Sequence, residues 1–141
     1  MKLSARNVFP GTVTKVTKGA VNSEVHLALK NGDKMVSIIT NGSVDTLGLK
    51  ENKSAWAIIK ASWVILGQDL HSTKLSTRNI LCGTVAKVTP GAVNTEISLK
   101  LKGDSMLTAI ITNESTRSLG FKEGDHACAA IKASSVILGV E

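Results

Sequence analysis

The sequence contains an internal duplication. Ser4–Gly67 aligns without a gap on Ser76–Gly139, and more than half of the aligned positions are identical. A solenoid would need shorter units in at least about three copies to build a core, so this long period seen only twice indicates a duplicated globular unit. We therefore predict two domains, at residues 1–68 and 73–141. Each unit has roughly 65 residues, a size at which one hydrophobic core is only marginally stable.

Alternating apolar residues predict strands in each unit, and a turn of the Asn-Gly-Asp type at residues 31–33 predicts a hairpin. Pro10 and Gly11 indicate a bulge or bend near the start of the first strand. The last two apolar runs can be two short strands or one long bent strand. The expected strands lie at residues 8–17, 23–30, 34–40, 54–62 and 63–67.

A short helix interrupts the alternation between the third and fourth strands. Asn41 or Ser43 can cap its start, and Gly48 can end it. Five strands with a helix in this place are typical of an OB-type Greek-key barrel. The predicted fold is all-β: two tandem OB-like five-stranded Greek-key barrels, each with one short helix.

Aromatic residues are few, and the chain has no Tyr. With so little aromatic area to bury, small units of this kind are expected to gain stability by packing against other copies. The opening MKLSARNVFPG has no apolar targeting segment, and no run approaches the roughly 18 apolar residues of a membrane span. A soluble, cytoplasmic oligomer that does not enter a membrane is expected.

Cys82 and Cys128 both lie in the second unit, where the first unit has Pro10 and Trp56. They are therefore not a framework common to both units. We interpret them as small buried hydrophobes, with a disulfide or a metal role as the less favoured alternatives.

The polar residues that recur are mostly hydrogen-bond donors. They comprise Ser-x-Arg-Asn before the first strand, Gly-Ala-Val-Asn between strands, Thr-Asn before the helix, and Lys-Ala-Ser near the end. Each segment alone could simply satisfy the local backbone. Their joint recurrence and the net charge of +6 favour an anionic ligand. No His, Cys and carboxylate cluster recurs, so neither a cation site nor catalysis is expected.

These motifs resemble the Mop domain of the molbindins, small proteins that bind molybdate and tungstate. The resemblance rests on S-A-R-N, on G-x-V followed by G-A-V-N, and on K-A-S-x-V-I-L-G, and it covers Ser4–Gly67 and Ser76–Glu141. The tandem arrangement is similar to the two-domain molbindins. In that family six OB-like domains assemble with oxyanions between them, which implies a homotrimer for a two-domain chain.

The resemblance implies two classes of oxyanion site. The first class uses one set from each copy: Ser4, Ala5, Arg6, Thr40, Lys60, Ala61 and Ser62, and Ser76, Thr77, Arg78, Thr112, Lys132, Ala133 and Ser134. The second class uses the backbone of the recurrent turns: Gly19, Ala20, Val21 and Asn22, and Gly91, Ala92, Val93 and Asn94.

The predicted function is binding of molybdate or tungstate for intracellular storage and homeostasis, without catalysis. The alternative is an OB-fold protein that binds single-stranded nucleic acid, which the basic composition permits. Such proteins use aromatic stacking platforms, and the two copies share no aromatic position, so nucleic acid is not expected as a partner. Mop units also serve as sensors fused to effector domains. We set that role aside because the two repeats account for nearly all of the 141 residues.

Overall fold

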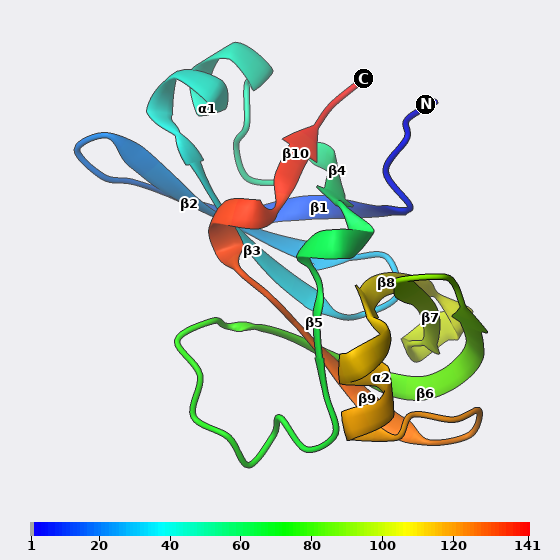
Figure 1. Cartoon of the computed structure of the whole chain (residues 1–141). Helices are drawn as coiled ribbons and strands as arrows, with labels where there is room; N and C mark the ends of the chain where they lie inside the picture. Colours follow the sequence, from blue (N-terminus) through cyan, green and yellow to red (C-terminus); the bar gives the residue numbers. More distant parts are fainter. Residues whose placement is uncertain (1) are drawn as a thin grey trace.

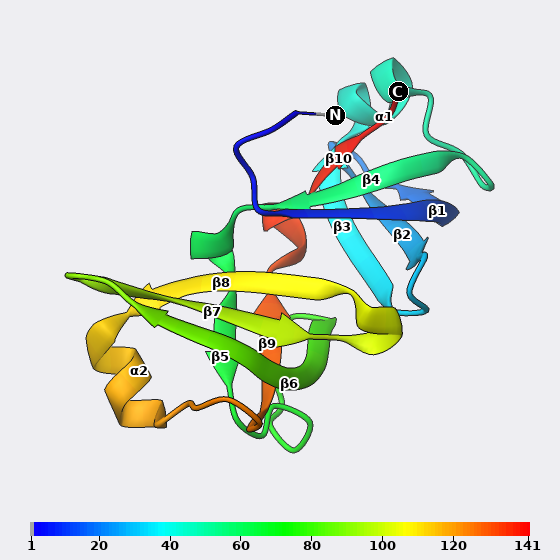
Figure 2. The same ribbon diagram turned by 90° about the vertical axis from the view of Figure 1, so that its right-hand side faces the viewer.

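The computed structural model describes residues 2–141 and contains two five-stranded antiparallel sheets, one in each lobe of the molecule (Figures 1 and 2). This confirms the predicted all-β fold with tandem barrels of the OB type. The elements of the first half are β1 (Asn7–Lys18), β2 (Asn22–Leu29), β3 (Lys34–Thr40), α1 (Asn41–Leu47), β4 (Ser54–Ile59), the 3-10 turn η1 (Ala61–Trp63) and β5 (Ile65–Gly67).

The second half repeats the same order, with one additional 3-10 turn at its second hairpin, between β7 and β8. Its elements are β6 (Asn79–Pro90), β7 (Asn94–Lys100), η2 (Lys102–Asp104), β8 (Met106–Thr112), α2 (Asn113–Leu119), β9 (His126–Ile131), η3 (Ala133–Ser135) and β10 (Ile137–Gly139).

The two halves exchange their last strands. The first sheet has the order β10-β4-β1-β2-β3, and the second has the order β5-β9-β6-β7-β8. Ile137 pairs with Ile58, and Ile65 pairs with Ala130. In Figure 2, β10 runs up into the lobe of the first half, while β5 descends into the other lobe. Each barrel is thus completed by a strand of the opposite half, an arrangement that the sequence analysis did not foresee.

Two buried asparagines join the halves further. The side chain of Asn79 donates to the Val36 carbonyl and accepts from the Val36 amide, both at 2.7 Å. Asn7 makes the same pair of bonds to Thr108, both at 2.8 Å. Each asparagine therefore extends the backbone pairing of a strand in the other half, and both side chains are almost fully buried.

The core is made of aliphatic residues from the inward faces of the strands and forms one cluster through both halves. Phe9 and Phe121 are its aromatic members.

Among the described residues, helices are too short and too polar for any of them to cross a bilayer.

Two local features differ from the expectations, and two others agree with them. Thr40, and neither Asn41 nor Ser43, caps α1, because its Oγ1 accepts from the Ser43 amide at 3.1 Å. The first strand pairs regularly with β4 at Pro10 and Gly11 and with β2 from Gly11 onward, and the bulge lies between Val13 and Lys15. The last apolar runs of each half are two short strands, as expected, separated by a 3-10 turn, and the alternative of one bent strand is wrong. Gly48 does end α1, with φ of 63°.

The interpretation of the two cysteines as free buried residues is wrong. Cys82 on β6 lies directly opposite Cys128 on β9, and the two form a disulfide. Antiparallel pairing brings directly opposite Cβ atoms within reach of one S–S bond. In the first half the same cross-strand position holds Pro10 and Trp56, so no equivalent bridge exists there.

Candidate functional site

A small pocket lies where the start of β6 meets the end of β9. Asn79 pairs with Ile131, so the segment before β6 and the segment after β9 leave the sheet side by side. The pocket has a volume of about 180 Å³, and its lining is Ile38, Ser76, Thr77, Arg78, Lys132, Ala133 and Ser134. Six of the seven residues of the predicted second-copy set therefore meet at one place.

Local hydrogen bonds fix the shape of this pocket. Thr77 Oγ1 donates to the Ile131 carbonyl at 2.6 Å and accepts from the Asn79 amide at 3.2 Å, so its hydroxyl ties the two segments together. Lys132 stands at the start of η3, where the Ser135 amide bonds back to its carbonyl at 2.9 Å. These bonds hold the Lys-Ala-Ser turn beside Ser76 and Arg78.

The seventh lining residue comes from the other half of the chain. Ile38 lies on β3, which packs against η3. The buried Ser37 hydroxyl next to it donates to the Val136 carbonyl at 2.7 Å, which holds β3 against the end of the second half. The pocket is thus a junction between the two repeats, not a cavity within one of them.

Arg78 forms an ion pair with Glu24 of β2, again across the junction. Glu24 also bonds to His26 Nε2 at 3.0 Å. Burial raises the pKa of the Glu24 carboxyl, but the hydrogen bonds and charges of Arg78 and His26 outweigh it, and the net pKa lies below the usual value of 4.5. The carboxylate therefore stays ionised and holds the guanidinium at the pocket.

The first half has the same arrangement. Asn7 pairs with Ile59, so Ser4, Ala5 and Arg6 leave the sheet beside the turn Lys60–Ser62. Arg6 is ion-paired with Glu96 of β7, as Arg78 is with Glu24. Lys60 and Lys132 are exposed, and neither makes an ion pair within residues 2–141.

The two threonines of the predicted sets lie elsewhere. Each caps a helix: Thr40 Oγ1 accepts from the Ser43 amide, and Thr112 Oγ1 accepts from the Ser115 amide. Thr112 lines a separate pocket together with Ser62 of the first copy. Because η1 packs against β8, Thr112 is grouped with the Lys-Ala-Ser turn of the first copy, and β3, which ends at Thr40, packs against η3 of the second copy.

The Gly-Ala-Val-Asn segments form the exposed tips of the β1–β2 and β6–β7 hairpins. The Gly19 amide already donates to the Asn22 carbonyl at 2.8 Å, which leaves fewer amides for an anion than the sequence suggested. A Cβ at Gly19 would come within 2.8 Å of that carbonyl, which explains the glycine. The side chain of Asn41 braces the tip by donating to the Gly19 carbonyl at 3.0 Å, and the second copy repeats these bonds.

Sequence reasoning missed the partners of the two arginines. Glu24 and Glu96 occupy equivalent positions in the two repeats. The sequence suggested no role for them, because no shared His or Cys accompanies them. Their recurrence together with that of Arg6 and Arg78 was the available signal. The sequence alone could not show that each arginine pairs with the glutamate of the other repeat, because it does not show how the two halves are placed.

Both repeats of the chain match a known domain. Residues 3–66 and 75–138 each match the TOBE domain. The chain is 44% identical to molybdenum-pterin-binding protein MopA of Rhodobacter capsulatus and 40% identical to molybdenum transport protein ModE of Azotobacter vinelandii, each over 99% of this chain. It spans about half the length of these relatives, 53% and 52% respectively.

A solved structure matches the whole chain. It is described as the cytoplasmic molybdate-binding protein ModG with molybdate bound, and it superposes with a TM-score of 0.97 at 48% identity over 100% of both chains. A score this high over the full length means that the relative placement of the two halves is shared as well.

Proposed function

The chain belongs to the TOBE domain family as a tandem pair, and on that premise we propose that it binds molybdate at the junctions between its halves, without a catalytic step. The observation that carries the proposal is the pocket at Arg78 and Lys132, which gathers residues from both ends of the second repeat and one from the first. The relatives named above for molybdenum or molybdate support the choice of ligand.

The lining of that pocket suits a small, fully deprotonated oxyanion. Two serine hydroxyls, a guanidinium and an ammonium can all donate, and no carboxylate lines the pocket among the described residues. Molybdate at neutral pH has only acceptor oxygens, whereas phosphate usually keeps a proton that needs an acceptor. The volume of about 180 Å³ is also below the roughly 300–1,000 Å³ of sites for drug-sized ligands.

The ion pair with Glu24 gives Arg78 a fixed orientation. A guanidinium has five N–H donors, so a carboxylate on one edge leaves donors for a second acceptor. Ordering the side chain in advance reduces the entropy that ligand binding must supply. Arg6 with Glu96 offers the same arrangement in the first copy.

Several finer points belong to the same proposal. We propose that tungstate, an oxyanion of the same shape and charge, binds as well, and that the protein stores or buffers molybdenum in the cytoplasm. The hairpin tips at Gly19–Asn22 and Gly91–Asn94 are proposed as the second class of site, formed between copies in a homotrimer. Nucleic-acid binding is not favoured, since the hairpin tips and pocket residues include no aromatic platform for stacking.

Calorimetric titration with molybdate tests the proposal. Arg78→Ala should remove a charge-assisted interaction of roughly 1.5–3 kcal/mol, or about ten- to a hundred-fold in affinity at one class of site. Arg78→Lys keeps the charge but loses the paired donors, so we expect it to bind less tightly than the unchanged protein. Sodium phosphate at the same concentration should give little heat.

Arg117→Ala is the matched control, since it removes one positive charge from an exposed position on α2. It should leave molybdate binding unchanged. Equal affinity of Arg78→Ala, Arg6→Ala and the unchanged protein would show that these arginines serve the fold alone.

A further inference from the structure

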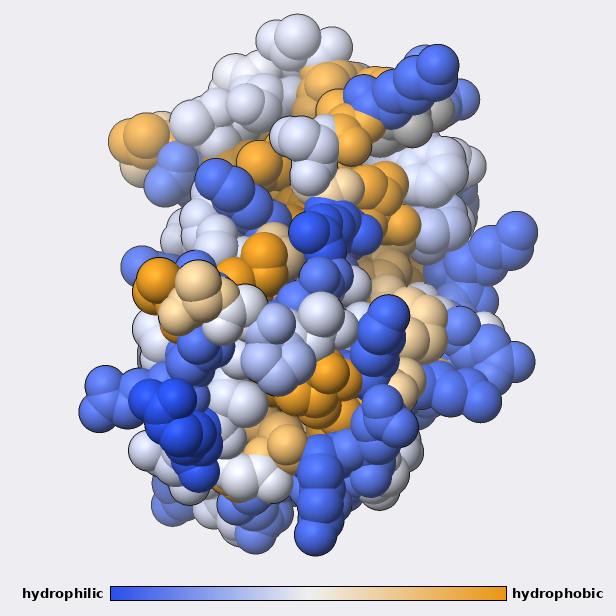
Figure 3. Space-filling model, turned by 45° about the vertical axis from the view of Figure 1, so that its right-hand side comes forward, coloured by the Kyte–Doolittle hydropathy of each residue, from blue (hydrophilic) through white to orange (hydrophobic). Residues whose placement is uncertain are grey.

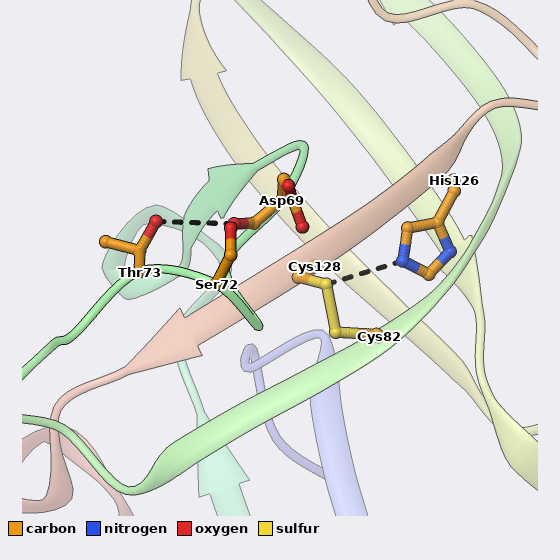
Figure 4. The surroundings of a disulfide bond; sticks show 6 residues. All are labelled: Asp69, Ser72, Thr73, Cys82, His126 and Cys128. Atoms are coloured by element: carbon orange, nitrogen blue, oxygen red, sulfur yellow. Dashed lines mark hydrogen bonds between the residues drawn. A yellow bond between two sulfur atoms is a disulfide. The ribbon is translucent and has the colours of Figure 1, made fainter.

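Four side chains that can ligate a metal gather at the second sheet, away from the oxyanion pocket. They are His71, Cys82, His126 and Cys128, and one ligand atom from each lies within 4.8 Å of all the others. Figure 4 shows Cys82, Cys128 and His126 on the facing strands β6 and β9. Nothing in the proposed binding of oxyanions makes use of this cluster.

The strands place three of these ligands. His126 and Cys128 are two residues apart on β9 and therefore point to the same face, where His126 Nε2 lies 3.7 Å from the Cys128 sulfur. Cys82 is directly opposite Cys128. The site is therefore built on a paired sheet, which is rigid enough to hold ligands in position.

The fourth ligand comes from the segment that joins the two halves. His71 stacks on His126 with the ring centroids 6.3 Å apart. The segment forms its own turn, because the Ser72 and Thr73 hydroxyls donate to the Asp69 carbonyl at 3.1 and 3.3 Å (Figure 4). That turn brings the imidazole of His71 to the disulfide.

We propose that the reduced form of this cluster is a tetrahedral Cys2His2 site for Zn²⁺. Zinc bound at about 2.3 Å by sulfur and about 2.0–2.1 Å by nitrogen separates its ligand atoms by roughly 3.3–3.8 Å. The present spread of 4.8 Å or less needs only small side-chain rotations, with the two sulfurs moving apart once their bond is broken.

The disulfide must be reduced before the cluster can bind zinc. A trialkylphosphine and one water molecule cleave the S–S bond and yield two thiols and one phosphine oxide. Zn²⁺ then binds both sulfurs as thiolates and releases two protons, while the imidazoles bind as neutral ligands. Reduced thiols are the usual state in a cytosol, so there the metal-binding form would predominate.

The site is specific to the second half. The first half has Pro10, Trp56 and Ser54 at the positions of Cys82, Cys128 and His126, and none of these is a zinc ligand. Gly67 of the exchanged strand β5 pairs with Cys128, so either the disulfide or the metal lies beside the strand through which the first half completes the second barrel. Metal binding would fasten the joining segment to that sheet.

Cobalt titration of the full chain tests the inference. Protein reduced with a trialkylphosphine should bind one Co²⁺ per chain, with the visible bands of a tetrahedral ion and a sulfur-to-cobalt charge-transfer band, and Zn²⁺ should displace it. The oxidised protein should show neither band. Zn²⁺ should also raise the melting temperature of the reduced protein and leave that of the oxidised protein unchanged.

Variants assign the ligands. Cys82→Ser combined with Cys128→Ser should abolish the charge-transfer band. His71→Ala and His126→Ala should each lower the affinity for Zn²⁺ at least about tenfold. Loss of a residue that only hydrogen-bonds to a metal ligand already costs about 10–100-fold in affinity. His26→Ala, in the other half, is the matched control and should bind like the unchanged protein. A reduced protein without the charge-transfer band, or histidine variants with unaltered affinity, would overturn the proposal.

Discussion

At the scale of single residues, the repeated Ser-x-Arg-Asn segment combines two tasks that the sequence could not separate. Its arginine lies at the candidate pocket and is held by a glutamate of the other half. Its asparagine is buried and replaces a missing strand neighbour for Val36 or Thr108. The asparagine of this segment therefore serves the fold, and in our proposal the arginine serves the ligand.

Replacing Asn79 by Ala should lower the free energy of unfolding by about 2–4 kcal/mol. The Val36 amide and carbonyl would both lose their partner, and each unsatisfied buried group costs about 1–3 kcal/mol. Urea denaturation followed by circular dichroism measures the loss, and Asn7→Ala should give a similar value. A loss below about 0.5 kcal/mol, the range of ordinary surface substitutions, would contradict the structural role.

Glu24 should make the protein sensitive to acid. Its pKa is lower in the folded chain than the usual 4.5, so the unfolded chain takes up the proton first as the pH falls. The stability that the ionised carboxylate contributes is complete above about pH 4.5 and is lost as the pH drops through the folded pKa.

Melting temperatures measured between about pH 6 and pH 3 check this prediction. Glu24→Gln should fall less steeply than the unchanged protein, and the two curves should converge at the acid end. Glu51→Gln, at an exposed position, is the control and should follow the unchanged protein. Parallel curves for Glu24→Gln and the unchanged protein would refute the prediction.

At the scale of elements, the strands, hairpins and helices follow from the sequence, and the exchange of β5 and β10 does not. Periodicity and turn residues act over a few neighbouring positions, which is why they locate elements well. Both exchanged strands read Ile-Leu-Gly. Pairing within a half or between halves would therefore bury the same side chains, and the sequence pattern is identical for the two arrangements.

In the candidate site, too, the sequence predicts what lies within one half and not what the other half contributes. The recurrent segments located both ends of the pocket at Arg78 and Lys132, because the strands that carry them are paired within one half. Ile38 and Glu24 come from the opposite half, and Thr112 lines a pocket with Ser62 of the other copy. These contacts could be known only from the three-dimensional arrangement.

Leu66 and Leu138 offer a direct test of the exchange. Each is 7% exposed on a strand that joins the other half's sheet, and truncation to Ala should cost about 2–5 kcal/mol. Hydrogen exchange should show that Leu66→Ala loosens β9, and that Leu138→Ala loosens β4. The reverse assignment would mean that each half keeps its own last strand.

At the scale of the whole molecule, the chain exposes more surface than its size requires. Its accessible area is 7996 Å², whereas a compact monomer of this mass has about 7,000 Å². Large apolar side chains are exposed on both halves, and Figure 3 shows apolar patches between charged side chains on one face. Val21 and Val93, at equivalent hairpin tips, are each 72% exposed.

We expect the protein to sediment at micromolar concentration as a trimer of about three times 14.8 kDa. Association would cover the exposed apolar side chains and the hairpin tips. Sedimentation equilibrium measures the mass directly. A stable monomer would remove the sites proposed between copies and leave those within the chain.

The exchanged strands also bear on how the protein is made. Ile137–Gly139, which close the first sheet, follow every other strand of the two halves along the chain and so leave the ribosome after them. Until then β4 has an unpaired edge, and an open edge can recruit strands of other nascent chains. The first sheet therefore begins to form before the second sheet but is completed after it, and its protection from aggregation during translation depends on how quickly β10 follows.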